Sequence, residues 1–376
     1  MNKYIERQLN LDNILSKKSL FLLGPRQTGK SSLIKHTLKN AIVYDLLDSS
    51  VFLELSQNPD RLSQQIISNK KVVVIDEIQR LPVLLNEVPR LIEEKGAKFL
   101  LTGSSARKLR RGGVNLLGGR ARTKHFFPFT FYELKEQFDL TRALFSGLIP
   151  SIYFSDDVDA DLAAYNGSYL QQEIIAESAT RNIQAFSRFL KIAALCNAKI
   201  VNFTNVASDA QVPRTTIYEY FDILKDTLIM RELPSFRKGN KRKPICSSKY
   251  YFFDVGVIRQ LQGRSNFSHG TPEFGEIFET FIINELFACS EYKKNLSLEF
   301  WRSTSGFEVD LIINEETAVE IKGKTNISAS DLKSLKALAE EYKLRRLVCV
   351  SLEKRPRKIG NIEILPYKDF LMDCWK

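Results

Sequence analysis

The chain has 376 residues, 44% of them hydrophobic, and a formal net charge of +11 at pH 7. This length predicts about two to four domains, and the lack of any apolar run of about 18 residues excludes a membrane-spanning helix. The N-terminus has no apolar signal core and the five cysteines are scattered, which favours free thiols and a cytoplasmic location, while the positive charge weakly favours a polyanionic partner.

The N-terminal part contains a phosphate-binding loop. An apolar run at Ser19 to Leu23 predicts a buried strand, and residues 32–38 have the apolar spacing of a helix. The residues between them match the pattern G-x-x-x-x-G-K-[ST]: Gly24, Pro25, Arg26, Gln27, Thr28, Gly29, Lys30 and Ser31. We expect this loop to bind ATP, with Lys30 on the β- and γ-phosphates. The hydroxyl of Ser31 or of the adjacent Ser32 would bind Mg²⁺.

A second motif supports nucleotide hydrolysis. A strand is predicted at Ala41 to Leu46, followed by a polar segment and then an apolar run that ends in Asp76 and Glu77. Asp76 would hold Mg²⁺, and Glu77 would polarise the attacking water. A strand that ends in a solvated acidic turn is the simpler alternative. The order of the two motifs favours the ATPase interpretation, because both would reach the ligand-binding edge of an α/β sheet.

The next buried strand, predicted at residues 98–105, ends in hydroxyl side chains. We expect Thr102 or Ser104 to contact the γ-phosphate or the water, although such a cluster is also common in turns. Basic, glycine-rich loops follow, and an arginine from one of them could accelerate hydrolysis, either within the chain or from a neighbouring subunit of a homo-oligomer. Arg120 is the first candidate and Arg122 the second, with a plain surface loop as the alternative. Residues 126–131 are predicted to form the last strand of this domain.

Residues 138–185 are predicted to be a helical spacer, and residues 186–262 a winged helix. A helix from Phe203, a turn at Gln211 to Pro213 and a helix from Arg214 have the order of a helix-turn-helix. Strands are predicted on both sides of a basic segment at residues 237–243, which would form the wing. Such a domain would contact nucleic acid through phosphates, with DNA favoured over RNA. A protein-contact module is the alternative.

The last part of the chain contains the residue pattern of a metal-dependent nuclease. Asp310, Glu320 and Lys322 lie on a predicted hairpin with a four-residue turn, and their D…E-x-K arrangement suits Mg²⁺. Glu279 lies within the apolar arc of the preceding helix, where a carboxylate needs a partner or a metal, and it completes the predicted ligand set. The alternative is that the acidic side chains form a solvated face. The turn length alone does not separate the two interpretations.

The whole chain resembles the bacterial and archaeal AAA+-like P-loop ATPases that carry a C-terminal restriction-endonuclease-like domain. The resemblance implies a P-loop core, a winged helix and a PD-(D/E)xK-like module; one departure is Ser31-Ser32, where that family often has two threonines. It rests on these segments: Tyr4-Ile5-Glu6-Arg7, Gly24 to Ser31, Asp76-Glu77-Ile78-Gln79, Leu101-Thr102-Gly103-Ser104, Gly119-Arg120, Phe278-Glu279, Glu308-Val309-Asp310 and Glu320-Ile321-Lys322.

We therefore expect an α/β protein with four parts: a P-loop ATPase core at 1–137, the spacer at 138–185, the winged helix at 186–262 and the nuclease-like domain at 263–376. The leading hypothesis is a cytoplasmic Mg²⁺-dependent ATPase that couples nucleotide state to DNA or RNA binding or processing, with nuclease activity left open. The alternative is a nucleotide-gated regulatory or signalling ATPase in which the C-terminal module is an inactive protein-interaction domain.

Overall fold

The computed structural model describes residues 4–66, 71–105, 107, 117–170, 182–236, 248–264 and 267–376. The chain divides into two compact units, which are described separately. Unit 1 comprises Met1–Phe129 with Glu173–Ala179 and Ile223–Ile229, and unit 2 comprises Thr130–Gln172, Thr180–Asp222 and Met230–Lys376. Within the described part of the chain, every helix is too short or too polar to cross a lipid bilayer. The four cysteines in this part, Cys196, Cys289, Cys349 and Cys374, are free thiols.

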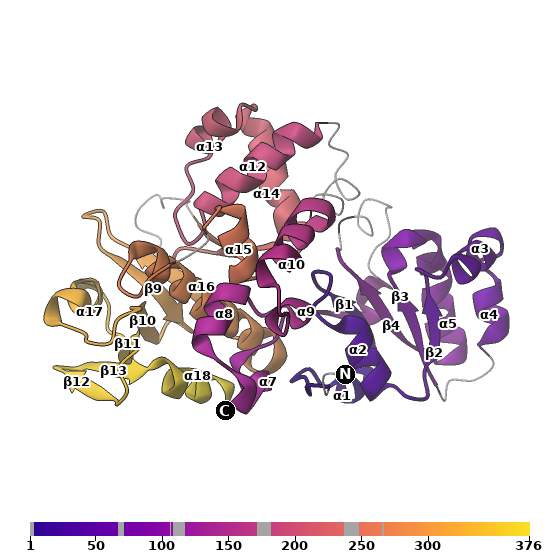
Figure 1. Ribbon diagram of the computed structural model, residues 1–376. Coiled ribbons are helices and arrows are strands. Elements are labelled where there is room, and N and C mark those ends of the chain that lie inside the picture. The colour runs from indigo at the N-terminus through magenta and orange to yellow at the C-terminus, as the bar shows by residue number, and fades with distance from the viewer. Residues whose placement is uncertain are drawn as a thin grey trace. The chain divides into compact units, whose positions relative to one another are not determined.

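Unit 1 is built on a five-stranded parallel sheet with the strand order β2-β3-β4-β1-β5 (Figure 1). Its elements are α1 (Leu11–Leu15), β1 (Ser19–Leu23), α2 (Lys30–Thr37), β2 (Ile42–Asp45), α3 (Ser49–Gln57), α4 (Arg61–Gln65), β3 (Val72–Asp76), η1 (Ile78–Arg80), η2 (Pro82–Asn86), α5 (Glu87–Lys95), β4 (Lys98–Gly103), η3 (Leu117–Gly119) and β5 (Ala121–His125).

The sequence of each strand fits its place in this sheet. The strands β1, β3 and β4 lie in the middle of the sheet and are almost entirely buried, as continuous apolar runs in a parallel sheet should be. Because all strands are parallel, the loops that follow these three strands meet at the same edge, where α/β proteins bind ligands. The phosphate-binding loop, Asp76-Glu77 and Ser104 are therefore brought to one place by the topology alone.

The predicted last strand of this unit is misplaced. The fifth strand is β5 (Ala121–His125), whereas residues 126–130 form a loop and α7 (Phe131–Leu134) follows. Pro128 has no N–H group to donate to a ladder, and Phe126 and Phe127 are buried without being in a strand. The basic residues of β5 are tolerated because it is an edge strand that pairs only with β1. One short helix, α1 (Leu11–Leu15), precedes the first strand of the sheet.

Unit 2 begins with short helices, continues with a helix-turn-helix segment and a two-stranded sheet, and ends with a six-stranded mixed sheet. Its elements are α7 (Phe131–Leu134), η4 (Lys135–Gln137), α8 (Leu140–Ser146), α9 (Pro150–Tyr153), α10 (Val158–Ala164), η5 (Tyr165–Leu170), α12 (Ile183–Leu195), α13 (Phe203–Ala210), α14 (Arg214–Asp226), β6 (Met230–Leu233), β7 (Lys249–Phe252), α15 (Val255–Leu261), α16 (Pro272–Cys289), η6 (Ser290–Lys294), β8 (Leu298–Arg302), β9 (Glu308–Ile313), β10 (Thr317–Ile321), η7 (Ala329–Leu332), α17 (Lys333–Glu341), β11 (Arg346–Ser351), β12 (Arg357–Ile359), β13 (Ile362–Pro366) and α18 (Tyr367–Trp375).

The large sheet of unit 2 has the strand order β12-β13-β11-β10-β9-β8, with β10, β11 and β13 parallel to one another. The hairpin β9–β10 is shorter at its turn than the sequence predicts. Ile313 pairs with Thr317, so the loop comprises residues 314–316, and Asn314 and Glu315 adopt positive φ angles of 51° and 57°. With a three-residue loop, the pairing that starts at Ile313 and Thr317 runs toward Asp310 opposite Glu320. The predicted four-residue turn would have shifted the register by one residue and put these two side chains on opposite faces.

Candidate nucleotide site and acidic cluster

The phosphate-binding loop lies between β1 and α2, as predicted. A Cβ atom added to Gly24 would lie 2.4 Å from the main-chain oxygen of Phe126, so only glycine fits there. Gly29 precedes α2 with φ of 95°, a conformation that other residues rarely adopt. The Nζ of Lys30 donates to the main-chain oxygens of Gly24 and Pro25, at 2.7 and 3.0 Å. The lysine ammonium therefore lies inside the curve of the loop.

Arg7 holds this loop from outside and was not identified as a site residue from the sequence. Its guanidinium donates to the main-chain oxygen of Thr28 at 2.8 Å and to those of Phe127 and Pro128 at 2.7 and 2.8 Å. It also lies over the ring of Phe126, 4.2 Å from the ring centroid. The side chain is buried, so the N-terminal segment is fixed to both the phosphate-binding loop and the loop after β5. A lone arginine in a polar segment gives no sequence signal of this role.

The predicted magnesium ligands come together at the carboxyl edge of the sheet. The hydroxyl of Ser31 donates to Oδ2 of Asp76 at 3.0 Å, which joins the start of α2 to the end of β3. Thr102 at the end of β4 contacts the other carboxylate oxygen of Asp76, and its Oγ1 accepts a hydrogen bond from the main-chain N–H of Glu77 at 3.1 Å. Thr102 therefore orients both acidic residues, in line with its predicted place at this edge. Ser31 and the alternative hydroxyl, Ser32, are both exposed on α2, and the contact with Asp76 is made by Ser31.

The side chain of Glu77 is held by a glutamine that sequence reasoning also missed. The amide nitrogen of Gln79 contacts Oε2 of Glu77 and donates to Oγ of Ser104 at 3.2 Å. Glu77 has φ of 59°, a left-handed conformation that is costly for a residue with a side chain and is typical of functional sites. Glu77, Gln79 and Ser104 are all buried, so the carboxylate has a fixed direction at the edge of the sheet.

These residues fit a hydrated Mg²⁺ ion bound together with a nucleotide. Mg²⁺ prefers oxygen ligands and keeps several of its waters, so that proteins supply one or two ligands and the substrate phosphates supply others. The paired oxygens of Ser31 and Asp76 form such a donor set. No three His, Cys, Asp or Glu side chains among the described residues are arranged as a complete metal site.

Arg120 lies away from the nucleotide site of its own chain. It precedes Ala121, which pairs with Ser19 at the beginning of β1, whereas the phosphate-binding loop follows Leu23 at the end of that strand. Its Nε donates to a carboxylate oxygen of Glu93 at 2.6 Å. The expectation that Arg120 reaches the γ-phosphate within one chain is therefore wrong, because the sheet separates the two positions. A contribution from a neighbouring subunit stays a prediction.

The two helices predicted for the helix-turn-helix form at the positions expected from the sequence. Helix α13 ends before Gln211, which has φ of 56°, and α14 begins at Arg214. Arg214 and Thr215 are exposed at the start of α14, and the guanidinium of Arg214 donates to the hydroxyl of Tyr218 at 2.7 Å. The strands β6 and β7 pair in antiparallel fashion. The basic segment predicted as the wing, residues 237–243, lies outside the described residues.

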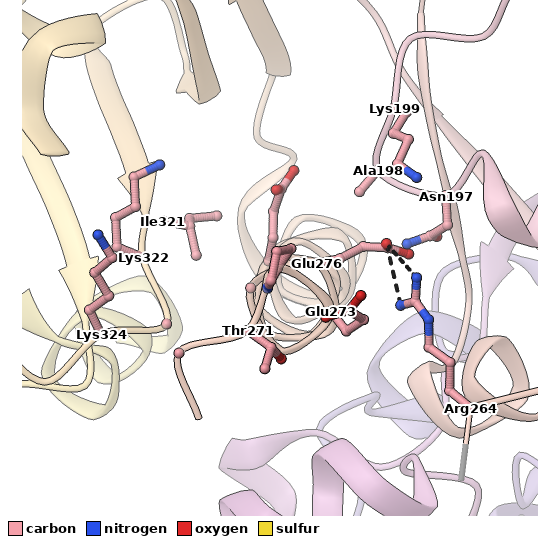
Figure 2. Close-up of a pocket in the computed structure, with 15 residues that line it drawn as sticks. Asn197, Ala198, Lys199, Arg264, Thr271, Glu273, Glu276, Ile321, Lys322 and Lys324 are labelled. Atoms are coloured by element: carbon pink, nitrogen blue, oxygen red, sulfur yellow. Dashed lines mark hydrogen bonds and ion pairs between the residues drawn. The ribbon is translucent and has the colours of Figure 1, made fainter. Parts of the chain in front are cut away.

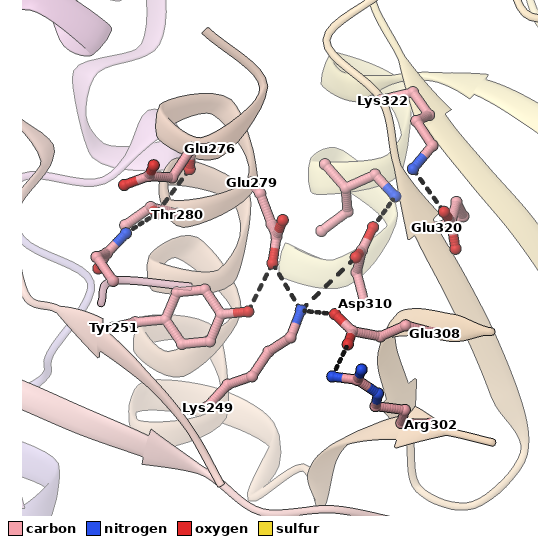
Figure 3. A network of polar contacts seen from close by, with 12 residues as sticks. Lys249, Tyr251, Glu276, Glu279, Thr280, Arg302, Glu308, Asp310, Glu320 and Lys322 are labelled. Atoms are coloured by element: carbon pink, nitrogen blue, oxygen red, sulfur yellow. Dashed lines mark hydrogen bonds and ion pairs between the residues drawn. The ribbon is translucent and has the colours of Figure 1, made fainter. Parts of the chain in front are cut away.

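In the C-terminal part, Glu279 of α16 has partners that come from β7 (Figure 3). The ammonium of Lys249 lies 3.2 Å from Oε1 of Glu279, and the hydroxyl of Tyr251 donates to the same oxygen at 2.7 Å. Lys249 also lies 2.7 Å from Oε1 of Glu308 and 3.9 Å from Oδ1 of Asp310. We call Lys249 with Glu279, Glu308 and Asp310 the acidic cluster. The lysine was missed because nothing in the local sequence distinguishes it from any other lysine at the start of a strand.

Asp310 and Glu320 are buried, with 7% and 3% of their surface exposed, so the expectation of a solvated acidic face is wrong. Oδ2 of Asp310 accepts a hydrogen bond from the N–H of Ile321 at 2.7 Å, and the Nζ of Lys322 donates to Oε1 of Glu320 at 2.5 Å. Burial and the nearby Asp310 raise the pKa of Glu320 to about 8. Burial opposes the charge of Lys249, but Glu279 and the other acidic groups raise its pKa well above the usual value.

The predicted ligand set Glu279, Asp310 and Glu320 does not form a metal site as the side chains lie, since the described residues contain no such group of three. Lys249 lies 3.2 Å from Glu279 and Lys322 lies 2.5 Å from Glu320, so these two ammonium groups contact carboxylate oxygens that a metal would need. A cavity of about 560 Å³ lies beside Glu279, with Lys322 and Lys324 on one side of α16 and Arg264 on the other (Figure 2). Its charges are of both signs and partly paired, as in Arg264 with Glu276.

Comparisons with known proteins divide the chain into three matched regions. Residues 16–135 match the family described as an AAA domain. Residues 137–268 and 274–370 match two families described as domains of unknown function, DUF8612 and DUF4143. The first match agrees with the parallel sheet and the site geometry described above. Residues 16–135 are therefore similar to AAA-type P-loop domains, which supports nucleotide binding, whereas the nuclease-like and winged-helix assignments receive no support from the families that match.

Two uncharacterized proteins, one from a bacterium and one from an archaeon, are similar over most of this chain. The chain is 25% identical over 346 residues to the uncharacterized protein Rv2008c of Mycobacterium tuberculosis, a match that covers 88% of this chain and 76% of the relative. It is 23% identical over 347 residues to the uncharacterized protein MJ1544 of Methanocaldococcus jannaschii, covering 83% of this chain and 75% of the relative.

Two solved structures share limited likeness. One is a signal transduction ATPase with numerous domains from Pyrococcus horikoshii, which has a tetratricopeptide repeat sensor. It is 14% identical with a TM-score of 0.25, and the match covers 77% of this chain but only 47% of that protein. The other is the Aeropyrum pernix ORC1 protein in complex with DNA, which is 13% identical with a TM-score of 0.24 and covers 67% of this chain and 90% of that protein. Likenesses of this size say nothing about the function of this chain.

Proposed function

We propose that unit 1 hydrolyses ATP in a Mg²⁺-dependent reaction and that the nucleotide state controls binding of DNA, or of RNA, by the helix-turn-helix segment. The observation that supports hydrolysis most directly is the junction of Ser31, Asp76 and Thr102, which joins α2, β3 and β4 at one edge of the sheet. A loop that only bound phosphate would not need a carboxylate and a second buried acid placed beside it. The adjacent Glu77 supplies that second acid.

Each side chain of the site would have a separate role in ATP hydrolysis. The Nζ of Lys30 would exchange its bonds to the oxygens of Gly24 and Pro25 for bonds to the β- and γ-phosphates. Glu77 would orient and polarise the attacking water, and Ser104 would hold that carboxylate through Gln79. When bound at Ser31 and Asp76, Mg²⁺ would neutralise charge on the phosphate oxygens. Arg120 would act only from a neighbouring subunit, which would make hydrolysis depend on a homo-oligomer.

Support for nucleic-acid binding comes from the helix-turn-helix segment and from charge. Arg214 and Thr215 are exposed at the beginning of the second helix of this segment, the end that enters a groove in such domains. The sequence between β6 and β7 contains five Lys or Arg residues and no acid at 237–243, in a chain with net charge +11. We propose that these elements form a winged helix that binds the backbone phosphates, with little preference for sequence.

The test is ATP hydrolysis with and without double-stranded DNA, at two salt concentrations. The proposal predicts stimulation by DNA that weakens as salt rises, because phosphate contacts release counterions. Neutralising Lys241, Arg242 and Lys243 together with Arg214 should remove the stimulation and leave the basal rate intact. A matched control that neutralises the four exposed residues Lys343, Lys354, Arg355 and Lys358 of the C-terminal part should keep the stimulation. A rate of ATP hydrolysis that is the same with and without DNA would contradict the proposed coupling.

A second candidate is a nucleotide-gated regulatory ATPase whose C-terminal module is an inactive protein-interaction domain. One observation favours the inactive module, namely that the predicted metal-binding carboxylates are already paired with Lys249 and Lys322. In this case ATP hydrolysis would persist without any response to DNA, and no cleavage of DNA would be seen in Mg²⁺. The same assay therefore separates the two candidates.

A further inference from the structure

The acidic cluster of unit 2 has a lysine at its centre. The carboxylates belong to α16 and β9, whereas Lys249 and Tyr251 belong to β7, so three elements meet at one ammonium group (Figure 3). The side chain of Lys249 is 2% exposed, and those of Glu279 and Asp310 are 16% and 10% exposed. An ammonium buried to this extent is retained only where charged partners compensate for its lost hydration.

The partners of Lys249 are arranged around its three N–H donors. Glu308 and Glu279 lie within hydrogen-bond distance of Nζ, at 2.7 and 3.2 Å, and Asp310 lies at 3.9 Å. Tyr251, two residues further along the same strand, donates to the Glu279 oxygen that also faces Lys249. The arrangement gives the acidic cluster a fixed positive charge that the polypeptide itself supplies.

This arrangement does not fit a divalent metal ion. Mg²⁺ requires oxygens at about 2.0–2.1 Å in near-octahedral geometry. One oxygen of Asp310 is already occupied by the N–H of Ile321, and one oxygen of Glu320 by Lys322. Among the residues that the structure describes, no three acidic, His or Cys side chains converge as metal ligands. The ammonium of Lys249 and a metal bridging Glu279 and Asp310 would compete for the same oxygens and repel each other.

We propose that Lys249 is the built-in cation of the acidic cluster, so that unit 2 has no divalent-metal site at Asp310 and performs no metal-dependent cleavage. The lysine instead ties β7 of the two-stranded sheet to α16 and β9. The C-terminal module thereby keeps the acidic residues of a nuclease as a structural ion-pair network. This inference concerns unit 2 alone and stands or falls independently of ATP hydrolysis by unit 1.

The test is Mn²⁺ binding, measured by electron paramagnetic resonance and calorimetry on the full chain without nucleotide. All variants carry Asp76→Asn, which removes the metal ligand of unit 1. In this parent, adding Asp310→Asn should leave Mn²⁺ binding unchanged, because Asp310 holds no metal. Adding Lys249→Met should create one site, at least roughly tenfold tighter than any in the parent, because three carboxylates lose their cation. Lys249→Arg keeps the charge and should create none.

Adding Asp310→Asn to the Lys249→Met variant should remove the new site, which distinguishes it from adventitious binding. A parent that already binds Mn²⁺ through Asp310 would overturn the proposal, as would a folded Lys249→Met variant that gains no site. If Lys249→Met does not fold, the comparison of the parent with its Asp310→Asn form decides the matter. Equal Mn²⁺ binding by these two supports the proposal, and a loss in the second overturns it.

Discussion

The guanidinium of Arg7 donates a hydrogen bond to the main-chain oxygen of Thr28, 2.8 Å away, inside the phosphate-binding loop. We expect Arg7→Ala to weaken ATP binding at least roughly tenfold, because the loop loses the contact that fixes its curve. The substitution would also leave the main-chain oxygens of Thr28, Phe127 and Pro128 without the hydrogen bonds that Arg7 donates. This loss should lower the free energy of unfolding by about 2–4 kcal/mol. Titration with a fluorescent ATP analogue and chemical denaturation check both effects. Glu6→Ala, an exposed neighbouring change, should alter neither.

Gly24→Ala should abolish nucleotide binding, because the new Cβ would lie 2.4 Å from the rigid main-chain oxygen of Phe126. The control is Gly275→Ala in α16, where a new Cβ meets nothing within 4 Å. That change should leave binding intact and stabilise the protein by up to about 1 kcal/mol through helix propensity. Equal ATP affinity in Gly24→Ala and the unaltered protein would contradict the role of close packing in the loop.

Gln79→Ala should lower the rate constant kcat for ATP hydrolysis by about 10–100-fold with little change in ATP affinity. The reason is that Gln79 orients Glu77 and Ser104 without lying in the phosphate-binding loop. Steady-state kinetics beside equilibrium binding distinguish these effects. A rise in KM with kcat unchanged would show that Gln79 serves nucleotide binding instead.

The stability of the protein should depend on pH through Glu285. Burial raises the pKa of this carboxyl from 4.5 to about 8, even though it accepts hydrogen bonds from Phe131 and Trp375. Because the folded state then binds this proton more tightly than the unfolded state, the contribution of Glu285 to stability is complete below pH 4.5 and is lost as the pH rises to about 8. The loss attributable to Glu285 is at most about 5 kcal/mol. Glu285→Gln should flatten this slope in denaturation curves measured from pH 5 to 8, and an unchanged slope would contradict the shift.

The nucleotide site could be predicted from the sequence because each of its motifs is a short local pattern, and a parallel sheet places these motifs at one edge. The phosphate-binding loop, Asp76-Glu77 and Thr102 each lie at or directly after the end of a buried strand, and the parallel order of β3, β4 and β1 brings their carboxyl ends together. The position of Arg120 could not be predicted, because a residue next to a strand can lie at either edge. The edge strand β5 is basic and polar, so the strand was predicted instead at the apolar residues 126–131 that follow it.

The acidic cluster could be predicted only in part. The sequence indicated that Glu279 needs a partner, but it favoured a metal, since carboxylates on a hairpin have a known chemistry. The actual partner, Lys249, is 30 residues away in sequence and reaches Glu279 only through the packing of β7 on α16. The hairpin register also depended on a three-residue loop, residues 314–316, which no propensity distinguishes from a four-residue one.

The central claim is that unit 1 hydrolyses ATP with Glu77 as the residue that activates water. The most direct measurement is phosphate release from ATP in Mg²⁺ by the unaltered chain and by Glu77→Gln, with ATP binding measured in parallel. We predict that Glu77→Gln binds ATP with similar affinity and hydrolyses it at least about 100-fold more slowly. Equal rates in the two proteins, or no hydrolysis by the unaltered chain, would contradict the account.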